Sequence, residues 1–180
     1  RAQATVKRLE ELNRNLLDLA RLEAARENKN AAPIDLSDLV RQLAEVYASQ
    51  AEQADVAFQV ELPDAPVIIR GDALQIQRAI GNLIENALKF TPPKGNVRVQ
   101  ASQNQDGVSV SVSDTGIGIS PDDLPQLFNR FHRGRNATSY PGSGLGLAIV
   151  KAIAEQNDAE VRAENLVPGV RFTLQWHKTR

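Results

Sequence analysis

The sequence predicts an α/β fold of the α+β two-layer sandwich type, in which a mixed β-sheet is covered on one face by helices and preceded by an amphipathic helix. Three observations predict it. Apolar residues recur at spacings of three and four in long segments, and they alternate with polar residues in shorter segments. Gly, Pro, Asn and Asp cluster where the two patterns meet. The 180 residues suffice for one domain with a short appendage, and 42% apolar residues exclude disorder as the main state.

The first segment, residues 1–27, is expected to form the amphipathic helix. Its leucines recur at helical spacing, as Leu9, Leu12, Leu16, Leu19 and Leu22. One helix cannot bury this stripe, and residues 28–33 have the composition of a linker. We therefore expect the helix to pair with another helix or chain, the alternative being that it packs on its own domain. Because the sequence opens without Met and inside a helical pattern, we expect a fragment of a longer protein.

Residues 34–180 are expected to form the domain itself. Strands are expected at 34–36, 56–62, 67–69, 97–101, 108–112, 159–164 and 170–176. Helices are expected from an N-cap at Ser37, from Asp72 to about Phe90, and from about Leu145 to Gln156. Residues 115–141 are rich in Gly, Pro, Ser and charged side chains, which makes a long loop for a compact domain. We expect this loop to be functional or mobile.

Composition excludes several kinds of site. The sequence has no Cys, which excludes a thiolate metal site, an iron–sulfur cluster and a cysteine nucleophile. His132 and His177 are interpreted as ordinary surface residues, so any metal should have oxygen ligands. With 21 Lys and Arg against 22 Asp and Glu, nucleic acid is not an expected partner. No apolar run reaches the roughly 18 to 20 residues that span a membrane, so this segment is expected to be soluble.

Four polar side chains share one face of the helix expected at 72–90. Asn82, Glu85, Asn86 and Lys89 stand at positions i, i+3, i+4 and i+7. Two Asn residues lower helix propensity, but their side-chain carbonyl oxygens are good ligands for a hard cation. The pattern indicates a binding face, and a solvated helix surface is the alternative.

Two glycine-containing motifs follow. Asp114-Thr-Gly116-Ile-Gly118 comes directly after an alternating strand, where a carboxylate can accept a hydrogen bond from the exocyclic amine of a planar base. Residues 142–147, Gly-Ser-Gly-Leu-Gly-Leu, precede a helix whose N–H groups and dipole favour a phosphate. Their spacing is neither that of the P-loop nor that of the dinucleotide fold. A simple turn and a flexible hinge, respectively, are the alternatives.

The order of these motifs resembles that of sensor histidine kinases. The similar segments are residues 82–91 for the N box, 114–118 for the first glycine box, 128–133 for the phenylalanine box and 142–147 for the second glycine box. Residues 34–177 resemble a complete ATP-binding catalytic domain, and residues 16–23 are similar to the second helix of the dimerisation and histidine-phosphotransfer domain.

This resemblance implies a Bergerat-type ATP-binding fold, shared with gyrase, chaperone and mismatch-repair ATPases. It also divides the chain into three parts. Residues 1–27 would be the C-terminal helix of the dimerisation domain, 28–33 a linker and 34–180 the catalytic domain, with a lid at about 119–141.

At the phosphate end, the resemblance implies that Asn86 holds Mg²⁺ through its side-chain oxygen, with Asn82 supporting the same cluster. Lys89 would meet the ATP phosphates, and Arg130 or Arg133 would add charge near the γ-phosphate. Glu85 would lie on the metal side, with metal, water and Lys89 all open as its partner.

At the base end, the resemblance implies that Asp114 accepts a hydrogen bond from the adenine amino group. Gly116 and Gly118 would make room for the base, Phe90 would line the nucleotide pocket, and Ile119 would be among the nucleotide-binding residues. The second glycine box would close the lid on the triphosphate, and its expected nucleotide-binding residues are Gly142, Ser143, Gly144, Leu145, Gly146 and Leu147.

The implied activity is transfer of the γ-phosphoryl group of Mg·ATP to a histidine on the dimerisation domain, outside this sequence. An aspartate in the receiver domain of a response regulator would take it next. The parent protein would form a homodimer through its helix bundle. The part described by this sequence would lie in the cytoplasm, and the resemblance is compatible with a parent protein anchored in the inner membrane. Asn82 stands where ATP-hydrolysing members of the superfamily carry Glu, which favours transfer over hydrolysis.

Two alternatives remain open, a nucleotide-binding regulatory module without transfer and a serine kinase of the anti-sigma-factor type. The helix at 1–27 favours the histidine kinase, because such a serine kinase would not need a bundle helix there. Pro141, Val170 and residues 156–158 depart from the family pattern, which affects the expected affinity and lid motion but not the fold.

Overall fold

The structure is a computed structural model, and it describes residues 1–178. Its α-helices are α1 (Ala2–Ala24), α2 (Leu36–Gln53), α3 (Ala73–Phe90) and α4 (Gly146–Gln156). Its strands are β1 (Ala32–Asp35), β2 (Ala57–Glu61), β3 (Ile68–Gly71), β4 (Asn96–Asn104), β5 (Gly107–Asp114), β6 (Glu160–Asn165) and β7 (Val170–His177). None of the helices within residues 1–178 combines the length and the apolar character needed to cross a membrane.

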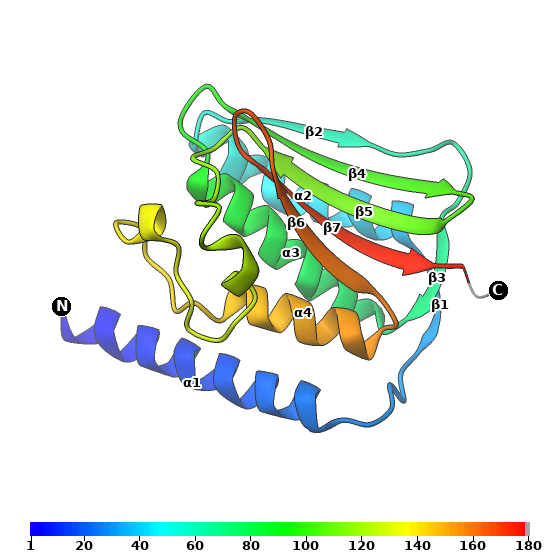
Figure 1. Cartoon of the computed structure of the whole chain (residues 1–180), viewed down its shortest axis with the longest axis horizontal. Coiled ribbons are helices and arrows are strands. Elements are labelled where there is room, and N and C mark those ends of the chain that lie inside the picture. The colour runs from blue at the N-terminus through cyan, green and yellow to red at the C-terminus, as the bar shows by residue number, and fades with distance from the viewer. Residues whose placement is uncertain (179–180) are drawn as a thin grey trace.

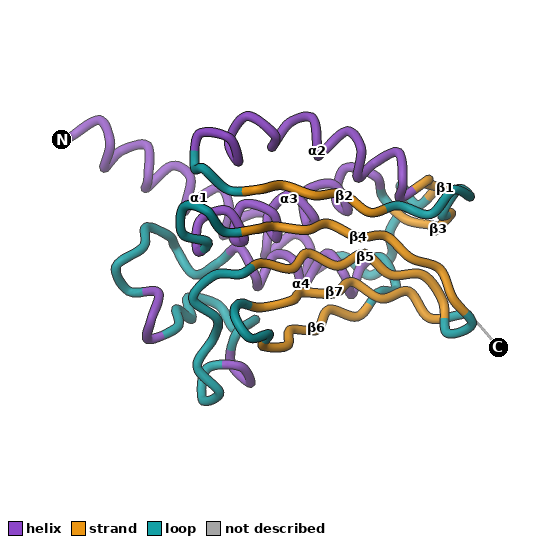
Figure 2. Tube along the Cα trace, turned by 90° about the horizontal axis from the view of Figure 1, so that it is seen from above, coloured by secondary structure: helices purple, strands orange, loops and turns teal. Residues whose placement is uncertain are grey.

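Five strands form the main sheet, in the order β2-β4-β5-β7-β6 (Figure 2). β2 runs parallel to β4, and the other neighbours are antiparallel. The helices α2, α3 and α4 all lie on one side of this sheet (Figure 1). β1 and β3 pair separately as a small antiparallel ribbon. The predicted fold class, a mixed sheet covered on one face by helices, is therefore confirmed.

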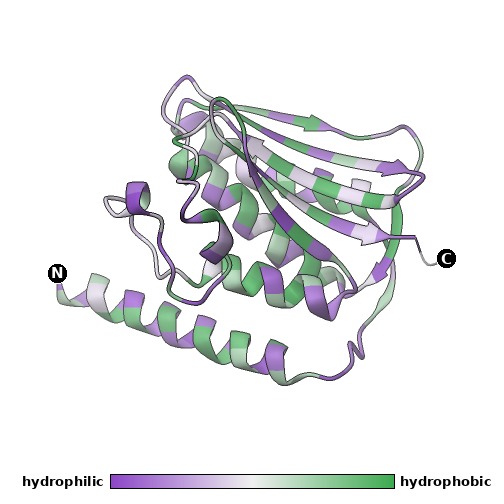
Figure 3. Cartoon of the chain, in the orientation of Figure 1, coloured by the Kyte–Doolittle hydropathy of each residue, from purple (hydrophilic) through white to green (hydrophobic). Residues whose placement is uncertain are grey.

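The core lies between the sheet and α3, because strand side chains alternate between the two faces. Hydrophobic and hydrophilic residues alternate visibly along the strands in Figure 3. On β5, Val108, Val110 and Val112 are buried, whereas Ser109 and Ser111 are only half-buried. The apolar face of α3 is fully buried, through Ile76, Ala79, Ile80, Leu83 and Ile84. Each buried side chain of the Leu or Ile type contributes about 1.5–3 kcal/mol, so α3 is held firmly and its polar face has a fixed direction.

Two residues expected on apolar helix faces are instead exposed. Val46 on α2 and Leu74 in the first turn of α3 are 60% and 79% exposed, respectively. The sequence pattern places each of them near the edge of an apolar stripe, and no neighbouring element of the described chain covers that edge.

The N-cap of α2 is Asp35 rather than the expected Ser37. The Asp35 carboxylate accepts hydrogen bonds from the backbone N–H groups of Ser37 at 2.9 Å and of Val67 at 3.2 Å. It therefore caps the helix and also joins it to the segment before β3. Ser37 is buried, and its hydroxyl has no hydrogen-bond partner in the structure.

Helix α1 packs against α4 of its own domain, and its expected pairing with another helix or chain stays a prediction (Figure 1). Leu19 is 1% exposed at this contact, and the Gln156 side-chain amide donates to the carbonyl oxygens of Leu22 and Ala25 at 2.9 and 2.7 Å. Arg78 on α3 pairs with Asp18 at 2.9 Å. The helix ends at Ala24, three residues earlier than expected.

Asn157, at the end of α4, is a buried junction between distant parts of the chain. Its side-chain oxygen accepts from Asn28 in the linker and from the backbone N–H of Asp72, both at 2.8 Å. Its side-chain nitrogen donates to Gln75 and to the Ile153 carbonyl oxygen, also at 2.8 Å. Residues 156–158, which depart from the family pattern, therefore have a structural role, because the hydrogen bonds of Asn157 fix the linker against the start of α3.

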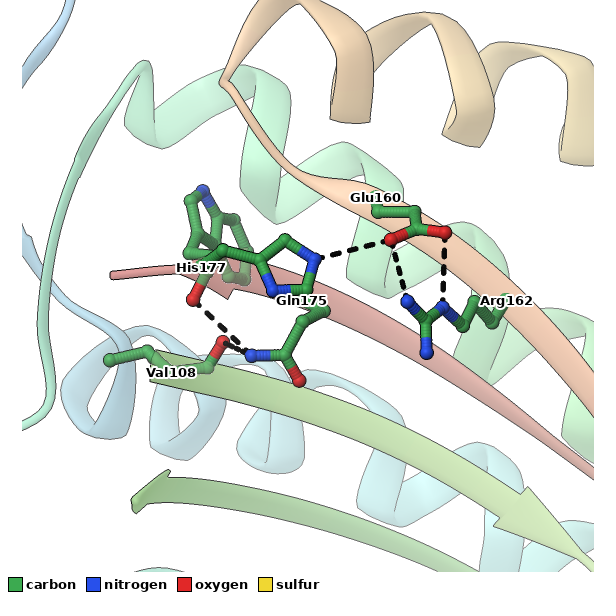
Figure 4. Close-up of polar contacts among 6 residues, drawn as sticks. Val108, Glu160, Arg162, Gln175 and His177 are labelled. Carbon is green, nitrogen blue, oxygen red and sulfur yellow. Dashed lines mark hydrogen bonds and ion pairs between the residues drawn. The ribbon is translucent and has the colours of Figure 1, made fainter. Parts of the chain in front are cut away.

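His177 lies at the exposed end of β7, as expected for an ordinary surface residue. Its Nε2 atom is 3.2 Å from Glu160 Oε2, and Arg162 donates to both oxygens of the same carboxylate, at 3.0 and 2.8 Å (Figure 4). The hydrogen bond from Arg162, followed by that from His177, lowers the pKa of Glu160 to about 2. This surface network faces away from the helices and lies outside the cleft described next.

Candidate functional site

A cleft of about 570 Å³ opens between α3, the end of β5, the start of α4 and the long loop that joins β5 to α4. The expected site residues that line it are Asn82, Glu85, Asn86, Lys89, Phe90, Asp114, Gly118, Ile119, Arg133, Gly142, Ser143, Gly144, Gly146 and Leu147. The motifs, separated by up to 65 positions in sequence, thus meet at one place. Gly116, Arg130 and Leu145 are not among the lining residues.

The α3 face is present as the sequence pattern predicts. Asn82, Glu85, Asn86 and Lys89 all line the cleft, because the opposite face of α3 is locked into the core. The Asn82 side-chain nitrogen donates to the carbonyl oxygen of Gly146 at 3.4 Å, which joins α3 to the first residue of α4. Glu85 accepts a hydrogen bond of 2.7 Å from the hydroxyl of Tyr47 on α2.

Lys89 lies under the second glycine motif. Its Nζ atom is 4.9 Å from the centre of the Phe90 ring. A Cβ atom on Gly142 would lie 2.8 Å from the same Nζ atom. Glycine at 142 therefore lets the ammonium group approach the loop backbone. Burial, and then the nearby charge of Arg133, lower the pKa of Lys89. An anion placed between these cations would favour the charged lysine.

Asp114 stands at the end of β5 and is 4% exposed. One carboxylate oxygen, Oδ1, accepts from the backbone N–H of Gly116 at 2.8 Å, which fixes the orientation of the group. Burial raises the pKa of Asp114, and hydrogen bonds from the backbone of Gly116 and Val170 partly offset that rise. The carboxylate is thus a buried hydrogen-bond acceptor of fixed orientation in the lining of the cleft.

The two glycines of the first motif differ in role. Gly118 lines the cleft with a φ of +70°, in the left-handed region that glycine adopts readily. Gly116 lies outside the lining, and a Cβ atom there would collide with the carbonyl oxygen of Phe90. The small size of Gly116 lets the end of α3 pack closely against it, and its expected role in making room for a base stays a prediction.

The second glycine motif leads directly into α4, whose N-cap residue Leu145 makes no side-chain capping bond. The N–H groups of the first turn are therefore free to meet a ligand, and Gly146 and Leu147 bring that turn to the cleft. Leu145 itself is 0% exposed and its side chain belongs to the hydrophobic core, while its expected place among the nucleotide-binding residues stays a prediction. Gly144 has a φ of +74° and lies against the backbone of Phe131.

The two candidate arginines are separated. Arg133 lines the cleft and donates to the carbonyl oxygens of Ala137, at 3.1 Å, and of Tyr140. Arg130 instead pairs with Glu23 on α1 and lies outside the lining, and its expected contribution of charge near a γ-phosphate stays a prediction. The guanidinium is drawn to an acidic partner on a helix that the sequence pattern did not place beside it.

His132 is not the ordinary surface residue that the sequence suggests. Its side chain is 15% exposed, lines the cleft, and has its Nε2 atom 3.5 Å from Asp123 Oδ1. That nitrogen is buried and makes no hydrogen bond in the structure. Other cleft residues that sequence analysis did not assign to the site include Ile117 and Val170, and on α1 Arg8, Glu11, Leu12 and Asn15. Ile117 lies inside the first glycine motif and could have been found there.

The donor set suits a hard cation that other ligands complete. Asn86 and Asn82 offer amide oxygens, and Glu85 adds a carboxylate on the same face. Within the described chain, no group of three or more His, Cys, Asp and Glu side chains could hold a metal ion by itself. Mg²⁺ commonly binds one or two protein oxygens and completes its shell with phosphates and water. The residues present therefore fit Mg²⁺ together with a polyphosphate.

The cleft brings together a fixed carboxylate, Asp114, a lysine, Lys89, and the uncapped N–H groups at the start of α4. This combination of groups suits the base and the phosphates of a nucleotide, and with the fold it defines the class of ATP-binding domains. Residues 71–180 match the family model of the histidine kinase-, DNA gyrase B- and HSP90-like ATPases. The chain belongs to this family, and its relatives are sensor histidine kinases.

Curated relatives include the signal transduction histidine-protein kinase/phosphatase MprB of Mycolicibacterium paratuberculosis, 38% identical over 92% of this chain and 31% of its own length. The phosphate regulon sensor protein PhoR of Pseudomonas aeruginosa is 34% identical over 94% of this chain and 38% of its own length. The chain thus spans less than half the length of these relatives.

Solved structures show the same fold. A mycobacterial sensor histidine kinase MprB superimposes with a TM-score of 0.73 at 32% identity, covering 79% of this chain and 95% of that one. Full-length ShkA in complex with AMPPNP gives a TM-score of 0.81 at 31% identity, covering 93% of this chain and 35% of that one.

Proposed function

We propose that this chain binds Mg·ATP in the cleft and supplies the γ-phosphoryl group to a histidine on a dimerisation domain, for relay to an aspartate of a response regulator receiver domain. One observation carries the proposal. The polar face of α3, the buried Asp114 and the glycine-rich start of α4 converge on one cleft although they are far apart in sequence. The similarity to ShkA, whose structure contains AMPPNP, supports a nucleotide as the ligand.

Asp114 would recognise the base. The backbone N–H groups of Gly116 and Val170 hold the Asp114 carboxylate, and because each carboxylate oxygen can accept more than one hydrogen bond, Oδ2 would also accept one from the adenine amino group. Guanine carries a carbonyl oxygen at that position, so a fixed acceptor disfavours it. Ile117, Gly118 and Ile119 would pack around the base.

The triphosphate would lie between Lys89, Arg133 and the first turn of α4. Arg133 would exchange its bonds to the lid carbonyl oxygens for phosphate oxygens. Mg²⁺, when bound with the nucleotide, supplies neutralisation of charge on the transferring group. Asn86 would hold it, and Asn82 would support the cluster while keeping α3 against the start of α4.

Transfer is proposed over hydrolysis because the chain places an amide, Asn82, where a water-activating carboxylate would be needed. An amide has no basic oxygen and cannot deprotonate water. A histidine acceptor brings its own nucleophilic nitrogen, so the cleft needs only to position and neutralise the phosphates. The further proposals are a homodimer through the helix bundle of the parent protein, a response regulator as partner, and a cytoplasmic location, where ATP is available.

Nucleotide binding is tested by isothermal titration of the chain with AMPPNP, in Mg²⁺ and in EDTA. The proposal predicts saturable binding of one AMPPNP per chain that strengthens in Mg²⁺, and much weaker binding of GMPPNP. Equal binding of both nucleotides, or no binding in Mg²⁺, would contradict it.

A further inference from the structure

Tyr47 connects α2 to the cleft through one hydrogen bond. Its ring is buried, with 7% of the residue exposed, and its hydroxyl donates to Glu85 Oε1 at 2.7 Å. Glu85 is exposed and lines the cleft, one position before Asn86. A hydroxyl that reaches from the core to an exposed carboxylate fixes a side chain that would otherwise be free to rotate.

The backbone of α3 is shaped to admit this hydroxyl. Gly81 lies one turn before Glu85, in the middle of the helix, where glycine is unfavourable compared with alanine. A Cβ atom at Gly81 would lie 3.0 Å from the Tyr47 hydroxyl oxygen, which is closer than nearly all contacts of real Cβ atoms. The absence of a side chain at 81 therefore makes room for the contact between Tyr47 and Glu85.

The contact is a lasting donor–acceptor pair. Burial, followed by the hydrogen bond to Glu85 and by its negative charge, raises the pKa of Tyr47, so the hydroxyl stays protonated at any physiological pH. Tyr47 has a single hydrogen to donate, and it goes to Oε1. The second carboxylate oxygen of Glu85 is left for the cleft.

That second oxygen has no cation to neutralise it. Within residues 1–178 the structure contains no ion pair between Glu85 and a Lys, Arg or His side chain, and Lys89 lies against the ring of Phe90 instead. The carboxylate is thus a charged acceptor beside the residue proposed to hold Mg²⁺. Mg²⁺ keeps several water molecules when protein and phosphate oxygens bind it, and those waters need acceptors.

We propose that Tyr47 is a positioning residue that holds Glu85 so that its free oxygen accepts a hydrogen bond from a water molecule on the Mg²⁺ ion. This inference rests on the proposed function, and it selects water among the three partners open for Glu85. Removal of the Tyr47 hydroxyl lets the carboxylate rotate and weakens the hold on that water. Without the hydroxyl, a higher Mg²⁺ concentration should be needed to tighten nucleotide binding. The affinity for the nucleotide in the absence of metal should change little.

The test measures AMPPNP affinity as a function of Mg²⁺ concentration, and separately in EDTA, together with thermal unfolding. Tyr47→Phe should raise the Mg²⁺ concentration needed for half-maximal tightening by about tenfold, and leave affinity in EDTA within about twofold of the wild type. Glu85→Gln keeps an oxygen that can accept from Tyr47 but loses the charge, and should raise the requirement at least as much. The double variant should not exceed the larger single effect, because both changes remove one function. Glu45→Gln removes an exposed carboxylate on α2 and serves as the matched control, with no change.

An unchanged Mg²⁺ requirement in Tyr47→Phe, with the wild type responding to Mg²⁺, would overturn the inference and leave a structural hydrogen bond. If Tyr47→Phe unfolds, Glu85→Gln decides, because an unchanged requirement in that variant would overturn it equally. Failure of the wild type to bind AMPPNP in Mg²⁺ would instead contradict the proposed function. The two failures are therefore distinguishable.

Discussion

Replacement of Asp114 by Asn tests base recognition with almost no change in shape. In the wild type, Oδ1 is held by the backbone N–H of Gly116 at 2.8 Å, and the asparagine oxygen can keep that bond. The asparagine NH₂ then occupies the position of Oδ2, so a donor faces the adenine amino group where an acceptor stood. A hydrogen bond to a charged group contributes about 1.5–3 kcal/mol, so ATP affinity should fall by roughly 10- to 150-fold.

The assay is competitive displacement of a fluorescent ATP analogue by ATP and by GTP, with both nucleotides in Mg²⁺. The new NH₂ group can donate to the carbonyl oxygen of guanine, so GTP affinity should stay the same or increase while ATP affinity falls. The ratio of the two affinities should therefore change by at least tenfold. Equal losses for ATP and GTP would refute the reasoning, because they would place Asp114 in a general structural role.

Three further predictions concern the metal, the junction and the lid. Asn86→Ala should abolish the tightening of AMPPNP binding by Mg²⁺ and leave binding in EDTA and thermal unfolding unchanged; a persistent Mg²⁺ effect in titration would remove the metal role. Asn157→Ala should lower the free energy of unfolding by about 2–4 kcal/mol in urea titration, because it strands the backbone N–H of Asp72 and breaks the bond to Asn28. A loss under about 0.5 kcal/mol would show that water replaces the amide. The lid at 119–141 should exchange its amides fast without nucleotide and slowly with Mg·AMPPNP, and strong protection in the free protein would contradict a mobile lid.

The face of α3 could be predicted because helix geometry alone decides which residues share a face. Asn82, Asn86 and Lys89 follow the spacing of one helical stripe, and the buried isoleucines on the other side fix its direction. The glycine motif before α4 was equally accessible, because an uncapped helix start binds anions wherever it occurs. These local rules account for most of the cleft.

The rest depended on which elements pack together. Arg130 turned to Glu23 because α1 lies against α4, and a stripe of leucines does not say which surface will cover it. The bond between Tyr47 and Glu85 joins residues 38 positions apart on two helices, so no local pattern contains it. Gly81 was the one sequence signal of this contact, because a glycine in the middle of a helix often indicates that a neighbouring group packs closely against the backbone there.

The N-cap of α2 shows a limit of short-range rules. Asp35 and Ser37 are both good capping residues, and they stand two positions apart at the start of the same helix. The structure selects Asp35 because its carboxylate also accepts the N–H group of Val67, a residue far along the chain. A tertiary hydrogen bond thus decided between two locally equivalent starts.

The most direct test of the central claim is phosphoryl transfer from γ-labelled ATP to a histidine. This chain would be joined behind a helix that bears the acceptor histidine, so that the helix bundle can form, and a His→Ala version of the acceptor would serve as control. The account predicts acid-labile label on the histidine-bearing chain in Mg²⁺, and none with the His→Ala acceptor, in EDTA or with Asn86→Ala. Binding of ATP followed only by release of free phosphate, with no label on the histidine, would contradict it.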